Sequence, residues 1–175
     1  SRVSRGLGDV YKRQDYMFQQ LMKNLSEIDF DGRIDFSRYH EPLSDKKDIL
    51  KRCRTVNYFI PKAKISINTN AEYLDRQYID ELLESYVDHI AIQAYLKNGV
   101  VEYDELGVFK RINQICKKIE VPEINPDDYK DKDWIRYQLP DIRSTIHARN
   151  YWKNGMNRAG TVLSLIHISE PTRHT

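Results

Sequence analysis

Residues 36–43, Phe-Ser-Arg-Tyr-His-Glu-Pro-Leu, and residues 65–70, Ile-Ser-Ile-Asn-Thr-Asn, each place a polar cluster at the end of a short apolar strand. The two segments lie about one strand–helix–strand unit apart. Because parallel strands end at the same edge of a sheet, both clusters are expected on one rim, where α/β proteins bind ligands. The pair therefore predicts an α/β fold with a ligand site at two neighbouring strand ends.

Helix-like and strand-like patterns alternate through the rest of residues 15–126. The expected helices cover 18–28, 49–56, 78–86 and 106–119. The expected strands cover 34–39, 63–68, 88–94 and 120–124, with a further one at 134–139. Ser44 or Asp45 is the expected N-cap of the second helix, and Asp75 that of the third. This rhythm predicts βα units and leaves a doubly wound sheet and a (β/α) barrel as alternatives.

The composition is that of one globular domain, with 175 residues, 40% hydrophobic and 31% charged. A formal net charge of +2 is too small to indicate a nucleic-acid or membrane-surface partner. The two cysteines, Cys53 and Cys116, lie at helical spacing among apolar residues and are expected to be buried and reduced. A cytoplasmic setting fits this cysteine usage.

The two ends of the sequence have a different character from the middle. Residues 1–14 and 163–175 each resemble a translated sequencing adaptor of the kind found in metagenome-derived sequences, so we expect them to be foreign tails. The natural part is then an internal fragment of a longer protein. We divide it into βα units at 15–126 and, at 127–162, the end of the core with an exit toward a further extension. Within this part, residues 142–160 are basic and predict an extended or loop-like segment.

Glu41 is the residue at the first strand end with the clearest chemistry. Its carboxylate and the neighbouring backbone carbonyls suit a ligand ammonium group through charge-assisted hydrogen bonds. The alternative is a capped turn in which Glu41 merely pairs with Arg38 or Lys46.

The segments 37–43 and 67–74 together resemble the core of radical S-adenosylmethionine (SAM) enzymes. In that family the second barrel strand ends in a Gly-Gly-Glu-Pro-like motif that holds the amino group of the SAM methionine. Tyr39 and His40 here replace the glycines, whereas Glu41-Pro42 is retained. A Thr-Asn-Gly motif follows the third strand in many members, and residues 69–71 match it with alanine in place of glycine.

The resemblance implies a partial (β/α) barrel and a set of cofactor-binding residues. That set is Tyr39, His40, Glu41, Pro42, Asn68, Asn70, Gln93 and Tyr95. Residues 157–160, Asn-Arg-Ala-Gly, also resemble the segment that precedes the cysteine-rich SPASM extension of peptide-modifying members. The implied activity is reductive cleavage of SAM at a [4Fe–4S] cluster, giving a radical that modifies a peptide or small metabolite.

The sequence departs from the family in one large respect. The defining Cys-x-x-x-Cys-x-x-Cys loop, whose thiolates hold the cluster, is absent before residue 34. We therefore expect the parent enzyme to use SAM and a [4Fe–4S] cluster, and this chain to hold neither fully and to be inactive. Two alternatives stay open, namely another α/β nucleotide- or sugar-binding transferase and a non-catalytic binding module of the same fold.

Two other histidines, at positions 89 and 147, are weaker candidates for the functional site than the residues at the strand ends. His89 precedes an apolar strand and is expected to be structural. His147 has no histidine or cysteine at ligand spacing, which argues against a zinc site.

Overall fold

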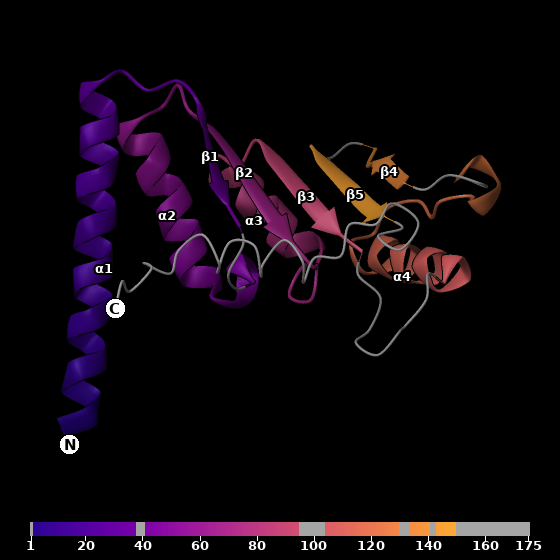
Figure 1. The fold of residues 1–175 in the computed structure, drawn as a ribbon, viewed down its shortest axis with the longest axis horizontal. Coiled ribbons are helices and arrows are strands. Elements are labelled where there is room, and N and C mark those ends of the chain that lie inside the picture. The colour runs from indigo at the N-terminus through magenta and orange to yellow at the C-terminus, as the bar shows by residue number, and fades with distance from the viewer. Residues whose placement is uncertain (1, 38–40, 95–103, 130–133, 141–142, 150–175) are drawn as a thin grey trace, which may run out of the picture.

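In a computed structural model, the described residues 2–37, 41–94, 104–129, 134–140 and 143–149 form a mixed α/β fold (Figure 1). The strands are β1 (Arg33–Phe36), β2 (Lys64–Thr69), β3 (His89–Gln93), β4 (Trp134–Gln138) and β5 (Ser144–Arg149). The helices are α1 (Arg2–Glu27), α2 (Lys46–Phe59), α3 (Arg76–Glu84) and α4 (Glu105–Lys118), with short 3-10 turns at Pro42–Ser44 and Pro126–Tyr129.

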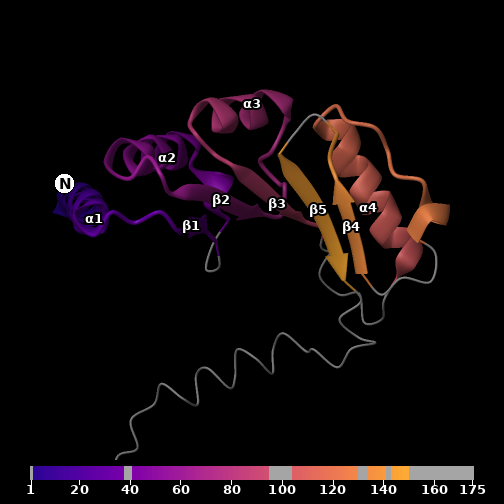
Figure 2. The ribbon, with the colours of Figure 1, turned by 90° about the horizontal axis from the view of Figure 1, so that it is seen from above.

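The strands form one five-stranded sheet in the order β1-β2-β3-β5-β4. β1, β2, β3 and β5 pair in parallel, and only β4 runs antiparallel, on the edge beside β5. Because β1, β2 and β3 follow one another in space as in sequence, right-handed crossovers place their connecting helices on the same face. Figure 2 shows α2 and α3 together on that face. This singly wound arrangement confirms the α/β class and favours a partial barrel over a doubly wound sheet.

The two faces of the sheet differ sharply in polarity, because side chains alternate along each strand. The helix-covered face holds the apolar core, and five isoleucines on it are almost fully buried: Ile65, Ile67, Ile90, Ile92 and Ile146. The register of the strands places mostly polar residues on the other face: Asp35, Ser66, Asn68, His89, Ala91, Gln93, Arg136, Thr145 and His147. No described helix covers this second face, which we call the polar face.

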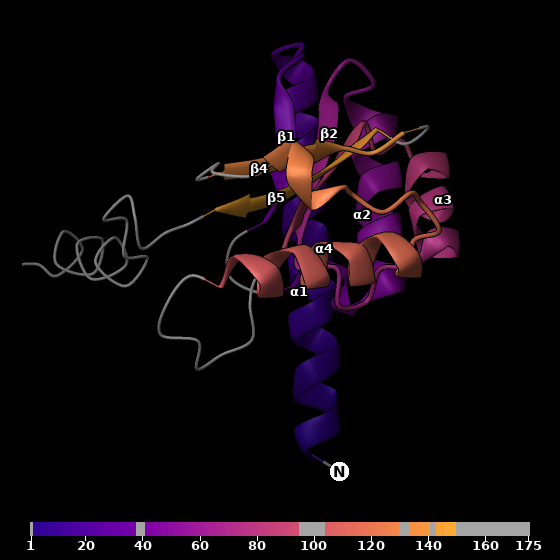
Figure 3. The same ribbon diagram turned by 90° about the vertical axis from the view of Figure 1, so that its right-hand side faces the viewer.

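The expected helices are present, and their starts are fixed by side-chain caps. Asp45 accepts the backbone N–H of Asp48 at 3.0 Å, and Asp75 accepts that of Tyr78 at 2.7 Å. α1 is continuous from Arg2, so no break marks the proposed boundary at residue 14, which stays a prediction. Figure 3 shows its amino-terminal half projecting beyond the other helices. None of the helices within the described ranges is both long and apolar enough to cross a membrane.

Two expectations about the carboxyl-terminal half are wrong. Residues 120–124 form no strand. Val121 and Ile124 are buried there, and their backbone N–H groups donate to the Cys116 carbonyl and the Asn113 side chain rather than to a neighbouring strand. The segment expected to be a loop-like exit from residue 142 instead contains β5, a central strand. Its backbone has hydrogen-bonding partners on both sides, β3 and β4, which offsets the weak periodicity of its sequence.

Candidate functional site

Glu41, in the segment that follows β1, is bonded to the carboxyl end of β2. The Thr69 hydroxyl donates to its Oε1 at 2.5 Å, and the backbone N–H of Asn70 donates to its Oε2 at 2.9 Å. The backbone N–H of Leu43 also donates to Oε1, at 3.3 Å, because Glu41 caps the 3-10 turn that Pro42 begins. The carboxylate is therefore held at the rim where both predicted polar clusters meet.

The loop after β2 is shaped for a residue without a bulky side chain. Ala71 has a φ of 61°, in the left-handed region that favours glycine. Its backbone N–H donates to Thr69 Oγ1 at 3.0 Å, and the N–H of Glu72 donates to the Asn70 side chain at 2.8 Å. This geometry gives a physical reason for a glycine after Thr-Asn in similar sequences.

Two cations of α4 hold the same loop from its other side. Arg111 donates to the backbone carbonyl of Asn70 at 3.3 Å, and Lys118 donates to that of Glu72 at 2.6 Å. The loop is thus held by the Glu41 carboxylate on the Asn70 N–H and by cations on its carbonyls. Such a set of charge-assisted contacts preorganises the rim.

The two partners weighed for Glu41 in a simple capped turn do not bind it in the described part of the chain. Lys46 forms its ion pair with Glu81 of α3, at 2.7 Å, and lies 4.8 Å from the centre of the Tyr78 ring. Arg38 lies outside the described residues. Two of the three described donors to Glu41 come from β2 and its loop and one, Leu43, comes from its own turn, so the residue both caps that turn and links it to β2.

Three more of the predicted site residues, Asn68, Asn70 and Gln93, lie on or beside the same rim. Asn68 and Gln93 are half-buried on the polar face, near the ends of β2 and β3. The Asn70 side chain is used within its own loop. The other three predicted residues, Tyr39, His40 and Tyr95, lie outside the described residues.

A chain of three side chains crosses the polar face from β3 to β5. The Thr145 hydroxyl lies 3.1 Å from His89 Nε2 and 2.7 Å from His147 Nε2. Thr145 is fully buried, and both imidazoles are half-buried. Burial, followed by Arg136 and Arg33, lowers the pKa of His89, while Asp35 opposes this shift. The expectation that His89 is structural stays a prediction, and its ring contributes a hydrogen bond between β3 and β5.

Neither cysteine is available to bind metal. Cys53 and Cys116 are free thiols buried in the core. Burial raises the pKa of Cys53 to about 12 and that of Cys116 to about 11, so both thiols are protonated at neutral pH. Since these are the two cysteines of the whole sequence, this chain has no set of three thiolates for a [4Fe–4S] cluster.

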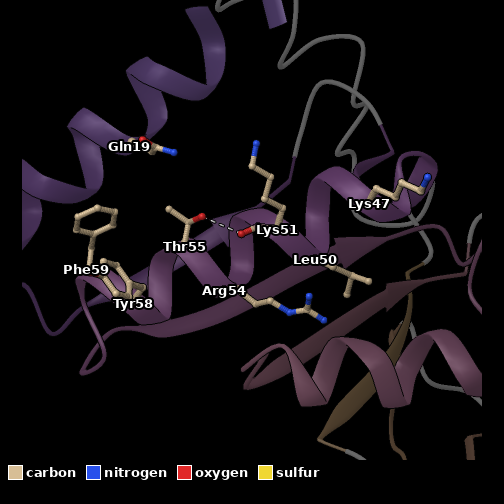
Figure 4. A pocket seen from close by; sticks show the side chains of 8 residues that line it. All are labelled: Gln19, Lys47, Leu50, Lys51, Arg54, Thr55, Tyr58 and Phe59. Atoms are coloured by element: carbon tan, nitrogen blue, oxygen red, sulfur yellow. Dashed lines mark hydrogen bonds between the residues drawn. The ribbon is translucent and has the colours of Figure 1, made fainter. Parts of the chain in front are cut away.

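The structure also has an open groove of about 700 Å³ between α1 and α2 (Figure 4). Three cationic side chains, Lys47, Lys51 and Arg54, line it together with Tyr58 and other residues. Lys51 is already paired with Asp15 of α1, and none of the predicted site residues is part of the lining. The groove is therefore separate from the candidate site.

Sequence reasoning missed several residues that build the site. Arg111 and Lys118 act from a helix distant in sequence, and no local pattern marks them. Thr145 was missed because β5 was not expected. The β-branched pair at 145–146, within the alternating segment Ser-Thr-Ile-His-Ala-Arg, was the available signal.

Comparison with known proteins identifies a SAM-dependent relative. The chain is 40% identical over 68 residues to the S-adenosyl-L-methionine-dependent 2-deoxy-scyllo-inosamine dehydrogenase of Niallia circulans. The match covers 39% of this chain but only 27% of that protein, so this chain spans well under half of its relative. No family model matches the sequence.

Two solved structures are also similar. They are a crystal structure of selenomethionine BtrN in an open conformation and one of BtrN in complex with AdoMet and 2-DOIA. The first has 30% sequence identity and a TM-score of 0.43, and covers 47% of this chain and 37% of that chain. The second has 26% identity and a TM-score of 0.44, and covers 58% and 40%. Both scores are low, so the fold class rests on the strand order and helix placement.

Proposed function

We propose that this chain is part of a radical SAM enzyme that acts on a small, hydroxyl-bearing metabolite, and that its rim binds the methionine end of SAM. The main support is the position of the Glu41 carboxylate at the joined ends of β1 and β2. The 40% identity to a SAM-dependent dehydrogenase of a small molecule supports the cofactor and the substrate class. It favours this function over a transferase and over modification of a peptide.

The Glu41 carboxylate has the capacity to bind an ammonium group. A carboxylate offers about four lone-pair directions. Three described donors use Glu41, two of them at Oε1 and one at Oε2. Oε2 can therefore accept one further donor, and a cationic donor such as the SAM amino group forms the stronger, charge-assisted bond.

The other predicted residues are proposed to line the cofactor from the same rim. Asn68 and Gln93, which carry neutral amides, suit the hydroxyls of the SAM ribose. Tyr39, His40 and Tyr95 are proposed to contribute to the same site. A SPASM-type extension after residues 157–160 remains a proposal that rests on sequence resemblance alone.

The catalytic cluster is not proposed for this chain. When bound, SAM supplies a radical only after reduction at a [4Fe–4S] cluster. The two buried thiols described above do not fit that cluster, so we propose that this chain binds SAM without cleaving it. Its own residues bind and orient the methionine end.

Isothermal titration of the 175-residue chain with SAM tests the proposed function. We expect binding, and we expect Glu41→Gln to weaken it about tenfold or more, since the neutral amide loses the charge-assisted bond. Glu84→Gln, on an exposed position of α3, is the matched control and should bind as the wild type does. Equal affinity in Glu41→Gln, or no binding by folded wild-type chain, would overturn the proposal.

A further inference from the structure

We propose that Arg111 is a positioning residue of the SAM site, which acts on the Glu41 carboxylate through a chain of hydrogen bonds and not by contact with the ligand. The inference rests on the proposed function, which assigns Glu41 to the SAM amino group. The carrying observation is that successive donors lead from the Arg111 guanidinium to Glu41 Oε1.

The chain runs through one peptide group and one hydroxyl. Arg111 Nη2 donates to the backbone carbonyl of Asn70 at 3.3 Å. That carbonyl shares its peptide group with the N–H of Ala71, which donates to Thr69 Oγ1 at 3.0 Å. The Thr69 hydroxyl in turn donates to Glu41 Oε1 at 2.5 Å. Every donor in the chain therefore points toward the carboxylate.

The two ends fix the direction of this chain. A guanidinium only donates, and an ionised carboxylate only accepts. Because the Thr69 oxygen already accepts the Ala71 N–H, its own proton lies on the bond to Glu41. The positive charge at one end and the negative charge at the other strengthen the bonds between them, since hydrogen bonds in a chain polarise one another.

Arg111 is well placed to supply this positive charge. It is half-buried on α4, and within the described ranges it forms no ion pair with a carboxylate. Its charge therefore acts on the Asn70 carbonyl without being neutralised by a neighbour. Partial burial also reduces the screening of that charge by water.

The chain determines which oxygen of Glu41 is open to a ligand. It holds the Thr69 hydroxyl on Oε1, which also accepts the N–H of Leu43. Among the described donors, Oε2 then receives only the N–H of Asn70 and keeps a lone-pair direction for the SAM ammonium group. Loss of the Arg111 charge should therefore weaken the binding of this group.

Lys118 holds the same loop, but the path from it ends elsewhere. Its ammonium donates to the carbonyl of Ala71 at 3.3 Å and to that of Glu72 at 2.6 Å. The Ala71 carbonyl shares its peptide group with the Glu72 N–H, which donates to the neutral side chain of Asn70. A simple clamp on the loop would make Lys118, with its shorter contact, at least as important as Arg111. The two cations therefore separate a clamp from a chain that acts on the carboxylate.

Isothermal titration of the 175-residue chain with SAM and with 5′-methylthioadenosine, which lacks the amino-acid end, tests the inference. Arg111→Gln should weaken SAM binding about threefold to fivefold and leave the affinity for 5′-methylthioadenosine unchanged. Lys118→Gln should weaken SAM binding less. Lys117→Gln, an exposed lysine in the same last turn of α4, is the matched control and should bind as the wild type does. Arg111→Met replaces Arg111→Gln if that variant does not fold.

A double-mutant cycle tests the route of the effect. In Thr69→Val the chain is already broken, so adding Arg111→Gln should cause no further loss of SAM affinity. The ligand-free chain provides a second readout, because the carboxyl-carbon NMR resonance of Glu41 should move in Arg111→Gln and stay in place in Lys117→Gln.

Three outcomes would overturn the inference. They are an unchanged Glu41 resonance in Arg111→Gln, an equal loss of affinity for both ligands in that variant, and a loss in Lys118→Gln as large as that in Arg111→Gln. The two proposals fail in different ways. Wild-type chain that does not bind SAM overturns the proposed function, while the resonance still decides whether Arg111 acts on Glu41. Equal SAM binding by the wild type and Arg111→Gln overturns only the role of Arg111.

Discussion

The Glu41 carboxylate accepts the backbone N–H of Asn70 across 2.9 Å, and this bond links the segment that follows β1 to the carboxyl end of β2, 29 positions away in sequence. Its other oxygen accepts the Thr69 hydroxyl from the same strand end. The residue that we propose as the ammonium-binding group is thus also a structural link. Replacing Glu41 should therefore lower both the free energy of unfolding and the affinity for SAM, and the two effects can be measured independently.

Glu41→Ala should lower the free energy of unfolding by about 1.5–3 kcal/mol, since hydrogen bonds to a charged group are lost and buried donors lose their acceptor. Urea denaturation monitored by circular dichroism measures this change. Glu84→Ala removes an equally charged but exposed side chain and should change stability by no more than about 0.5 kcal/mol. Similar effects of the two substitutions would show that the link between the strand ends is unimportant.

Ala71→Gly should raise the free energy of unfolding by roughly 0.5–1 kcal/mol, because glycine relieves the cost of the positive φ at this position. Ala148→Gly is the control, since Ala148 is buried in β5 and glycine weakens a strand interior. That substitution should lower stability by about 1 kcal/mol. A stability loss in Ala71→Gly as large as that in Ala148→Gly would contradict the left-handed conformation of the loop.

His89 should make the chain less stable as the pH falls. Burial lowers its pKa in the folded state below the ordinary value of 6.5, so the unfolded chain binds the proton more tightly. Stability is therefore retained above the unfolded pKa and lost as the pH falls through about 6.5 toward the folded value. Urea denaturation at pH 7.5 and 5.5 measures the slope, and His89→Gln should flatten it. An unchanged slope in that variant would assign the pH dependence to other groups.

Cys53 and Cys116 should react slowly with a thiol reagent in the native chain, because both are buried and their raised pKa values keep them protonated. Both should react at once in urea, which provides the internal control. Anaerobic reconstitution of the same chain with iron and sulfide should give no [4Fe–4S] absorbance. A stable cluster absorbance would refute the conclusion that these thiols do not fit it.

Much of this fold was predictable from sequence because it depends on interactions between residues that are close in sequence. Asp45 and Asp75 were correctly expected to begin helices, because capping depends on residues close in sequence. The first two strands were predictable to within a few residues for the same reason, since apolar runs and a following proline are local patterns, although β1 ends at Phe36 rather than at residue 39.

Long-range pairing accounts for what the sequence did not reveal. β5 is stabilised as a strand by its pairing with β3 on one side and β4 on the other, which the short alternating segment 144–149 by itself did not reveal. Arg111 and Lys118 reach the loop after β2 from more than 40 positions away. The link from His89 to Thr145 likewise spans 56 positions and depends on strand order.

Discrimination between SAM and 5′-methylthioadenosine, which lacks the amino-acid end, tests the central claim most directly. The proposed role of Glu41 predicts that the wild-type chain binds SAM at least about tenfold more tightly, because only SAM offers the ammonium group. In Glu41→Gln the two affinities should become nearly equal, with Glu84→Gln retaining the preference. Equal affinities in the wild type, or a preference that survives Glu41→Gln, would contradict the account.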